Sequence, residues 1–208
     1  ERFAVPALKG FGDKLLDFVE WFSSKQVHKN QLALNLRDIL AWVEFLNRTL
    51  GSNAVVNNSD CAPHDVQTAL YESYLHGASL VLLDGLGITH TLNNQSLKRE
   101  SIDFLMHQVP ENIRLQLRGI FLEPQQLIAS PKLLEITDES TTCQIGPFAI
   151  DKGPASEHKQ HKNPFTLHAP TTSCNVLRLL RAMQLPKPIL LEGSPGVGKT
   201  TLVEALGA

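Results

Sequence analysis

The sequence predicts an incomplete α/β fold preceded by a mainly α-helical domain. Apolar residues recur at helical spacing through about the first two thirds of the 208-residue chain. From Gly119 onward, short β-type runs replace that pattern. Near the end, the apolar run Ile189–Leu191 precedes a glycine-rich loop and an amphipathic segment, which is the order strand, loop, helix. We place the boundary near residue 140, so that residues 1–140 form the helical domain and 141–208 begin the α/β domain.

Four helices are expected in the first domain, because four segments carry apolar residues on one helical face. They cover Asp13–Phe22, Leu36–Leu46, Pro63–Leu83 and Ser96–Val109. Asn35 can cap the second helix, and Gly51 lies just past its end. Gly77 is a weak point in the third helix, and Pro110 stops the fourth.

The second domain is expected to combine short strands with two helices. The β-type runs cover Gln144–Ile150 and Phe165–His168, one helix carries Val176 to Met183, and another begins around Lys199. Between the two β-type runs, residues 151–163 form a polar connector that is typical of an exposed loop. Thr172 or Ser173 can cap the first helix, and Pro186–Pro188 breaks it. Ile189–Leu191 then has the composition of a buried parallel strand.

Composition indicates an ordinary globular protein and excludes several classes. The net charge of -2 is not the strongly basic balance typical of nucleic-acid binding. No run approaches the roughly 18 apolar residues of a membrane span, so no membrane partner is expected. Three widely spaced cysteines argue against a disulfide framework or a zinc knuckle. The sequence starts without Met or an apolar signal segment, so we expect a part of a longer, non-secreted protein.

The strongest motif is a phosphate-binding loop, a glycine followed by four residues, Gly-Lys and Ser or Thr. Its glycines let the backbone turn tightly and point N–H groups inward, where the next helix adds its N-terminal dipole. Lys199 would contact the β- and γ-phosphates, and the Thr200 hydroxyl would ligate magnesium. The expected contacts to ATP are Gly193, Ser194, Pro195, Gly196, Val197, Gly198, Lys199, Thr200 and Thr201. The alternative is a glycine-rich turn with an incidental lysine, which the strand–loop–helix context disfavours.

Two groups of residues carry a family resemblance. They are Ala169–Thr172, Asn175, Arg178, Arg181–Ala182 and Pro188–Thr200 near the end, and Leu34–Trp42, His76–Ala78 and Asp84–Leu86 earlier. Together they resemble the midasin family of dynein-related AAA+ ATPases. The resemblance implies that residues 1–140 are the helical lid of one AAA+ module and that 141–208 open the P-loop NTPase domain of the next. It also implies that Arg37 is a sensor of the γ-phosphate bound by the lid's own module. Alternatively, Arg37 is a solvated surface cation.

For the whole protein, the resemblance implies ATP hydrolysis by neighbouring AAA+ modules in a ring. That work would release assembly factors from precursors of the large ribosomal subunit (pre-60S particles), in the nucleolus and nucleoplasm. The chain shows no acidic strand after the loop, so we expect it to bind nucleotide without turning it over. Two alternatives stay open at this point: a MoxR-like or dynein-like ATPase, and a structural module that binds nucleotide without hydrolysis.

Other candidate residues favour simpler interpretations. Glu157, His158, His161 and His168 lack the spacing of a tetrahedral zinc site, so a solvated loop is expected. Cys143 and Cys174 are expected to be incidental thiols. Trp21 and Trp42 lie on apolar helix faces and indicate core packing, and Asp84 is expected to be a helix or turn residue.

Overall fold

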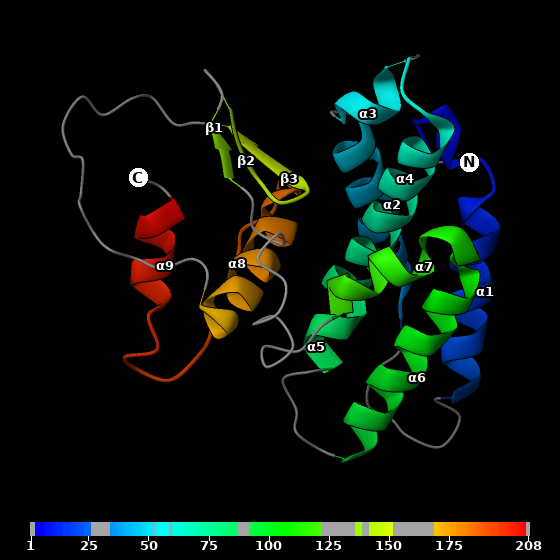
Figure 1. Cartoon of the computed structure of the whole chain (residues 1–208). Coiled ribbons are helices and arrows are strands. Elements are labelled where there is room, and N and C mark those ends of the chain that lie inside the picture. Colours follow the sequence, from blue (N-terminus) through cyan, green and yellow to red (C-terminus); the bar gives the residue numbers. More distant parts are fainter. Residues whose placement is uncertain are drawn as a thin grey trace. The chain divides into compact units, whose positions relative to one another are not determined.

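A computed structural model describes residues 3–25, 34–51, 53–58, 60–86, 92–121, 136–138, 142–151 and 169–206. The chain forms two compact units, Glu1–Phe121 and Leu122–Ala208. Figure 1 shows the helices of the first unit in blue to green and the strands and helices of the second in yellow to red. The boundary predicted near residue 140 lies outside the described residues, so the assignment of 1–140 and 141–208 to two modules stays a prediction.

The first unit is entirely helical in its described part. Its elements are η1 (Pro6–Leu8), α1 (Phe11–Lys25), α2 (Leu36–Gly51), α3 (Ala54–Asn57), α4 (Pro63–Ala78), the π-helical η2 (Ser79–Leu83), α5 (Asp84–Leu86), α6 (Leu92–Gln108), α7 (Glu111–Leu117) and η3 (Arg118–Phe121). The four predicted helices are confirmed as α1, α2, α4 with η2, and α6. Pro110 ends α6 as expected, and it also precedes α7, which the sequence did not predict.

The start of α2 illustrates how a local signal determines an element. The side-chain oxygen of Asn35 accepts hydrogen bonds from the backbone N–H groups of Arg37 and Asp38, at 2.8 and 3.2 Å. In return, the Asp38 carboxylate accepts a hydrogen bond from the Asn35 N–H at 3.0 Å. This reciprocal pair satisfies N–H groups that the first helical turn leaves unpaired. The predicted cap is confirmed, although Gly51 is the last residue of α2 rather than the residue after it.

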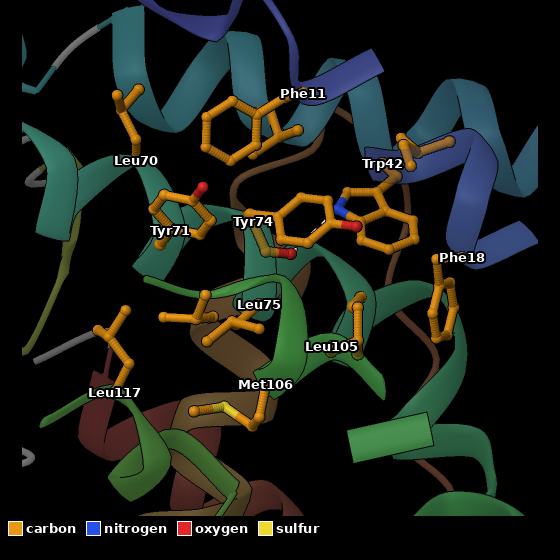
Figure 2. Close-up of a cluster of buried hydrophobic side chains, with 14 of the residues drawn as sticks. Phe11, Phe18, Trp42, Leu70, Tyr71, Tyr74, Leu75, Leu105, Met106 and Leu117 are labelled. Atoms are coloured by element: carbon orange, nitrogen blue, oxygen red, sulfur yellow. Dashed lines mark hydrogen bonds between the residues drawn. The ribbon is translucent and has the colours of Figure 1, made fainter. Parts of the chain in front are cut away.

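An aromatic cluster between α1, α2 and α4 forms the centre of the core (Figure 2). The Trp42 and Tyr74 rings stack with centroids 5.0 Å apart, and Phe18 meets the indole edge-on at 5.7 Å. The Trp42 Nε1–H donates to the Tyr74 carbonyl at 3.1 Å, so the buried indole has a partner. Trp42 is fully buried, which confirms its expected core role, whereas Trp21 is half-buried and stacks on Phe104 at 4.7 Å.

Gly77 does not interrupt α4, and its missing side chain allows α4 to pack closely against α2. A Cβ at position 77 would overlap the Trp42 indole and would lie 3.3 Å from Phe45 Cδ1. Glycine is unfavourable in a helix interior, so this position exchanges intrinsic helix stability for contact between two helices. The helix therefore continues through Gly77 to Ala78.

The second unit contains an antiparallel sheet in the order β1 (Ile136–Asp138), β2 (Thr142–Ile145) and β3 (Phe148–Asp151), followed by α8 (Pro170–Met183) and α9 (Lys199–Leu206). The hairpin of β2 and β3 turns at Gly146, where φ is +58°. It confirms the β-type run predicted over Gln144–Ile150. The run predicted at Phe165–His168 lies outside the described residues.

The predicted α/β fold class is wrong for the structure observed. Within the described residues the strands form a single antiparallel sheet, and Ile189–Leu191 is not a strand. Ile189 and Leu190 are 40% and 80% exposed, so this run is not buried between neighbours. A lone strand has no ladder of hydrogen bonds to stabilise it, and an apolar run therefore stays irregular without partner strands. The described chain is mainly α-helical.

The helix cap predicted for α8 is also wrong. Ala169 is the N-cap residue and makes no side-chain hydrogen bond, while Pro170 occupies the first turn. Proline suits that position because its fixed φ is helical and its missing N–H would be unpaired there anyway. Thr172 and Ser173 consequently lie inside the helix. The predicted end is confirmed, since α8 stops at Met183 before Pro186.

Candidate functional site

The glycine-rich loop leads directly into α9, whose first residue is Lys199. Gly196 and Gly198 both have φ of +80°, and Gly193 has φ of +154°. Side chains rarely adopt such φ values, so the glycines permit the tight turns of the loop. The first turn of α9 is closed by the Leu202 N–H, which donates to the Gly198 carbonyl at 2.9 Å. A helix beginning around Lys199 is thereby confirmed.

Lys199 connects the two ends of the loop. Its ammonium group donates to the carbonyl oxygens of Gly193 and Ser194, both at 2.8 Å. A Cβ at position 193 would lie 3.3 Å from Val197 Cγ2 and 3.8 Å from Lys199 Cδ, so these side chains border Gly193. The loop is thus closed by contacts between its own residues.

The exposure of the loop leaves its backbone accessible to an anion. Ser194 to Val197 are exposed, whereas Gly198 and Lys199 are half-buried. Thr200 is exposed and Thr201 is half-buried on the first turn of α9. The N-terminal N–H groups of a helix and its positive dipole end attract anions such as phosphate. Among the described residues, no group of three His, Cys, Asp or Glu side chains is placed to hold a metal.

Arg37 lies in the first unit, as the second residue of α2. Its backbone N–H takes part in the Asn35 cap, and its side chain is exposed. None of the ion pairs between described side chains involves Arg37. Since the first unit ends at Phe121, Arg37 and Lys199 belong to different units of the chain.

The remaining candidate residues from the sequence are the histidine group, the cysteines and Asp84. Glu157, His158, His161 and His168 lie outside the described residues. Cys174 is half-buried on α8. Asp84 is the first residue of α5, which confirms it as a helix residue.

The sequence analysis overlooked Glu72 on α4, where burial raises the pKa of the carboxyl group from 4.5 to about 7. Ala69 and His76, three and four residues from Glu72 on the same helical face, are buried in the structure. The sequence provides that spacing but not the burial, so it gave no clear signal for Glu72.

Comparison with known proteins identifies the first unit. A family model described as the midasin AAA+ ATPase lid domain matches residues 5–84. Most of the described helical unit, residues 5–84, therefore matches the lid domain of an AAA+ ATPase. The chain is 38% identical to midasin of Dictyostelium discoideum over 213 residues, covering 99% of this chain. It is 29% identical to midasin of Giardia intestinalis over 181 residues, covering 83% of this chain.

The chain belongs to the midasin family, as the resemblance of its motifs predicted. It spans 3% of the length of each of these two relatives. No solved structure matches the chain. Family membership decides against the alternatives of a MoxR-like or dynein-like ATPase. In the described residues, no helix is long and apolar enough to cross a membrane.

Proposed function

We propose that Gly193–Thr201 binds ATP with magnesium within a midasin-type AAA+ ATPase. The observation that carries this proposal is the local geometry of the loop: glycines with positive φ lead into the N-terminus of α9. Together these features place backbone N–H groups and a helix dipole beside one exposed turn. That arrangement favours the anionic phosphate groups of a nucleotide over a neutral ligand.

In this proposal each side chain has a distinct part. Lys199 exchanges its carbonyl partners for the β- and γ-phosphate oxygens, and Thr200 supplies one hydroxyl ligand to magnesium. Arg37, exposed at the start of α2, contacts the γ-phosphate of the ATP that is bound by the module to which the lid belongs. Its ATP would therefore be a different molecule from the one held at Lys199.

For the full-length protein, we propose ATP hydrolysis that drives mechanical remodelling. The partners are neighbouring AAA+ modules of the same chain, arranged in a ring, and precursors of the large ribosomal subunit from which assembly factors are released. We propose that this activity takes place in the nucleus. Family membership supports these roles, since 99% of this chain aligns with a midasin at 38% identity.

Calorimetry with magnesium-ATP tests the site. The 208-residue chain and one extended further toward the C-terminus are each compared with Lys199→Ala and Lys187→Ala variants. Lys187 is exposed in the same unit but lies outside the loop, so Lys187→Ala removes the same charge as a matched control. Binding that is lost with Lys199→Ala and kept with Lys187→Ala supports the proposal. Absence of binding in both folded chains refutes it.

Turnover separates an ATPase from a structural module. Hydrolysis by the extended chain that Lys199→Ala abolishes supports an active site. Tight binding without hydrolysis in that chain would instead assign the loop to a nucleotide-stabilised structural brace, because binding needs the loop whereas turnover also needs an acidic residue that positions water.

A further inference from the structure

The first turn of α2 is fixed by polar side chains on both sides of Arg37. The Asn35 side-chain oxygen accepts the Arg37 N–H at 2.8 Å and the Asp38 N–H at 3.2 Å, and the Asp38 carboxylate accepts the Asn35 N–H at 3.0 Å. We propose that Asn35 and Asp38 are positioning residues, whose reciprocal cap sets the direction in which the Arg37 side chain leaves the helix. This inference rests on the proposed function, in which Arg37 contacts the γ-phosphate of the ATP bound by the lid's own module.

The direction of the Arg37 side chain depends on the helical shape of this turn. In an α-helix each Cα–Cβ bond leans toward the N-terminus, so a side chain in the first turn extends toward the helix end. Arg37 is the second residue of α2, and its N–H is one of the four that an α-helix leaves without an internal partner. The Asn35 oxygen supplies that partner, and the Asn35 carbonyl accepts the Ile39 N–H at 3.2 Å. The cap therefore keeps Arg37 in the helical turn.

The charges of this turn suit contact with an anion better than they suit the stability of α2. A cation near a helix N-terminus opposes the positive end of the helix dipole, so Arg37 is unfavourable there and Asp38 is favourable. The Asp38 carboxylate is bonded to the Asn35 N–H, and none of the ion pairs between described side chains involves Arg37. The acidic residue thus stabilises the turn without neutralising the exposed guanidinium group.

A second asparagine cap in the same unit provides a matched control. The Asn53 side chain accepts the N–H groups of Val55 and Val56 at 2.9 and 3.2 Å, the same spacing as at Asn35. The helix that Asn53 caps, α3, contains no arginine. Asn53→Ala and Asn35→Ala therefore remove the same type of cap, but only Asn35→Ala loosens a turn that carries an arginine.

The test is a double-mutant cycle on the ATP turnover of the full-length protein. Arg37→Ala should raise the KM for magnesium-ATP about tenfold or more, because it removes a contact made by a charged donor. Asn35→Ala should raise the KM by up to about fivefold, and Asn35→Ser should restore most of the wild-type value, since serine also caps helices. In the Arg37→Ala background, Asn35→Ala should have no further effect, which a merely structural cap would not produce. Asn53→Ala should leave the KM unchanged.

The outcomes separate this inference from the proposed function. Wild-type turnover by Arg37→Ala would refute the contact of Arg37 with ATP, and the positioning role with it. A raised KM for Arg37→Ala beside a wild-type KM for Asn35→Ala would overturn the positioning role alone. Equal effects of Asn35→Ala with and without Arg37, or of Asn35→Ala and Asn53→Ala, would also overturn it, since the cap would then act through general stability.

A second measurement uses the wild-type 208-residue chain and needs no variant. NMR relaxation should give the Arg37 and Asp38 amides order parameters near ~0.85, the value of rigid backbone. Values below about 0.6 at these two amides would show that the cap does not hold the turn, and would overturn the positioning role whatever Arg37 contacts.

Discussion

Replacing Gly77 with alanine should destabilise the lid unit, although alanine is the better helix former. In a helix interior, Gly→Ala ordinarily stabilises by about 0.5–1 kcal/mol. Here the new Cβ would overlap the Trp42 indole and lie 3.3 Å from Phe45 Cδ1. Both aromatic side chains are fully buried, so they cannot move into solvent to make room.

The expected magnitude follows from three contributions. Overpacking of a core costs about 1–3 kcal/mol. Displacement of the indole also weakens its 3.1 Å hydrogen bond to the Tyr74 carbonyl, which costs about 0.5–1.5 kcal/mol. After subtraction of the helix-propensity gain, the free energy of unfolding should fall by about 2 kcal/mol. For a unit of this size, that corresponds to a fall in Tm of roughly 6–12 °C.

Gly85→Ala is the matched control, because it makes the same chemical change in α5 with no atom within 4 Å of the new Cβ. It should leave the free energy of unfolding unchanged or raise it by up to about 1 kcal/mol. Both tryptophans of the chain, Trp21 and Trp42, lie in the first unit. Tryptophan fluorescence during urea unfolding therefore follows that unit selectively.

The opposite signs of the two variants are the critical result. Equal effects of Gly77→Ala and Gly85→Ala would refute the steric argument. A further check combines Gly77→Ala with Trp42→Phe, which shortens the ring that the new methyl group meets. In that background Gly77→Ala should cost at least about 1 kcal/mol less than in the wild-type chain, because contacting residues are coupled. Additivity of the two changes would contradict a direct contact.

Three further predictions concern polar groups of the lid unit. Burial raises the Glu72 pKa from 4.5 to about 7, so the unfolded state ionises first and the free energy of unfolding should fall between pH 4.5 and 7. In urea unfolding, Glu72→Gln should remove this pH dependence: the free energy of unfolding of the variant should match that of wild type near pH 4.5 and exceed it at pH 8. The difference at pH 8 should be at most roughly 3 kcal/mol, and smaller to the extent that solvent screens the half-buried group. Parallel pH profiles of the two proteins would contradict this. Tyr74→Phe deletes the hydroxyl that donates to Gln108 Oε1 at 2.8 Å, so it should lower the free energy of unfolding by about 1–2 kcal/mol. Tyr71→Phe removes no hydrogen bond among the described residues and should lower it by less than about 0.5 kcal/mol in the same assay. Asn35→Ala should cost about 1 kcal/mol through loss of the α2 cap, with Asn35→Ser retaining most of that stability; an unchanged Tm for the alanine variant would exclude the cap as a stabilising feature.

The lid unit could be predicted from sequence because its signals are local. The second helix shows this: Asn35 bonds to backbone groups two and three residues away, and its apolar face repeats at helical spacing. The short helices α3 and α7 have too few residues to display that periodicity. The π-helical η2 was also not predicted, since its buried Ser79, Leu82 and Leu83 occur at spacings that an α-helix shares.

The second unit separates local from non-local information within a few residues. Ile189–Leu191 was expected to form a strand from its composition, but a strand depends on hydrogen bonds to segments that a composition does not specify. The adjoining loop depends on glycines at particular positions and on a lysine five to six residues from its partners, so its shape is determined by the loop's own sequence. The loop can therefore take its observed shape where the expected parallel strand does not form. Consequently, weak nucleotide binding by this chain would not by itself imply a misshapen loop. Under the proposed function, any affinity for magnesium-ATP that this chain lacks would instead be traced to contacts outside residues 193–201.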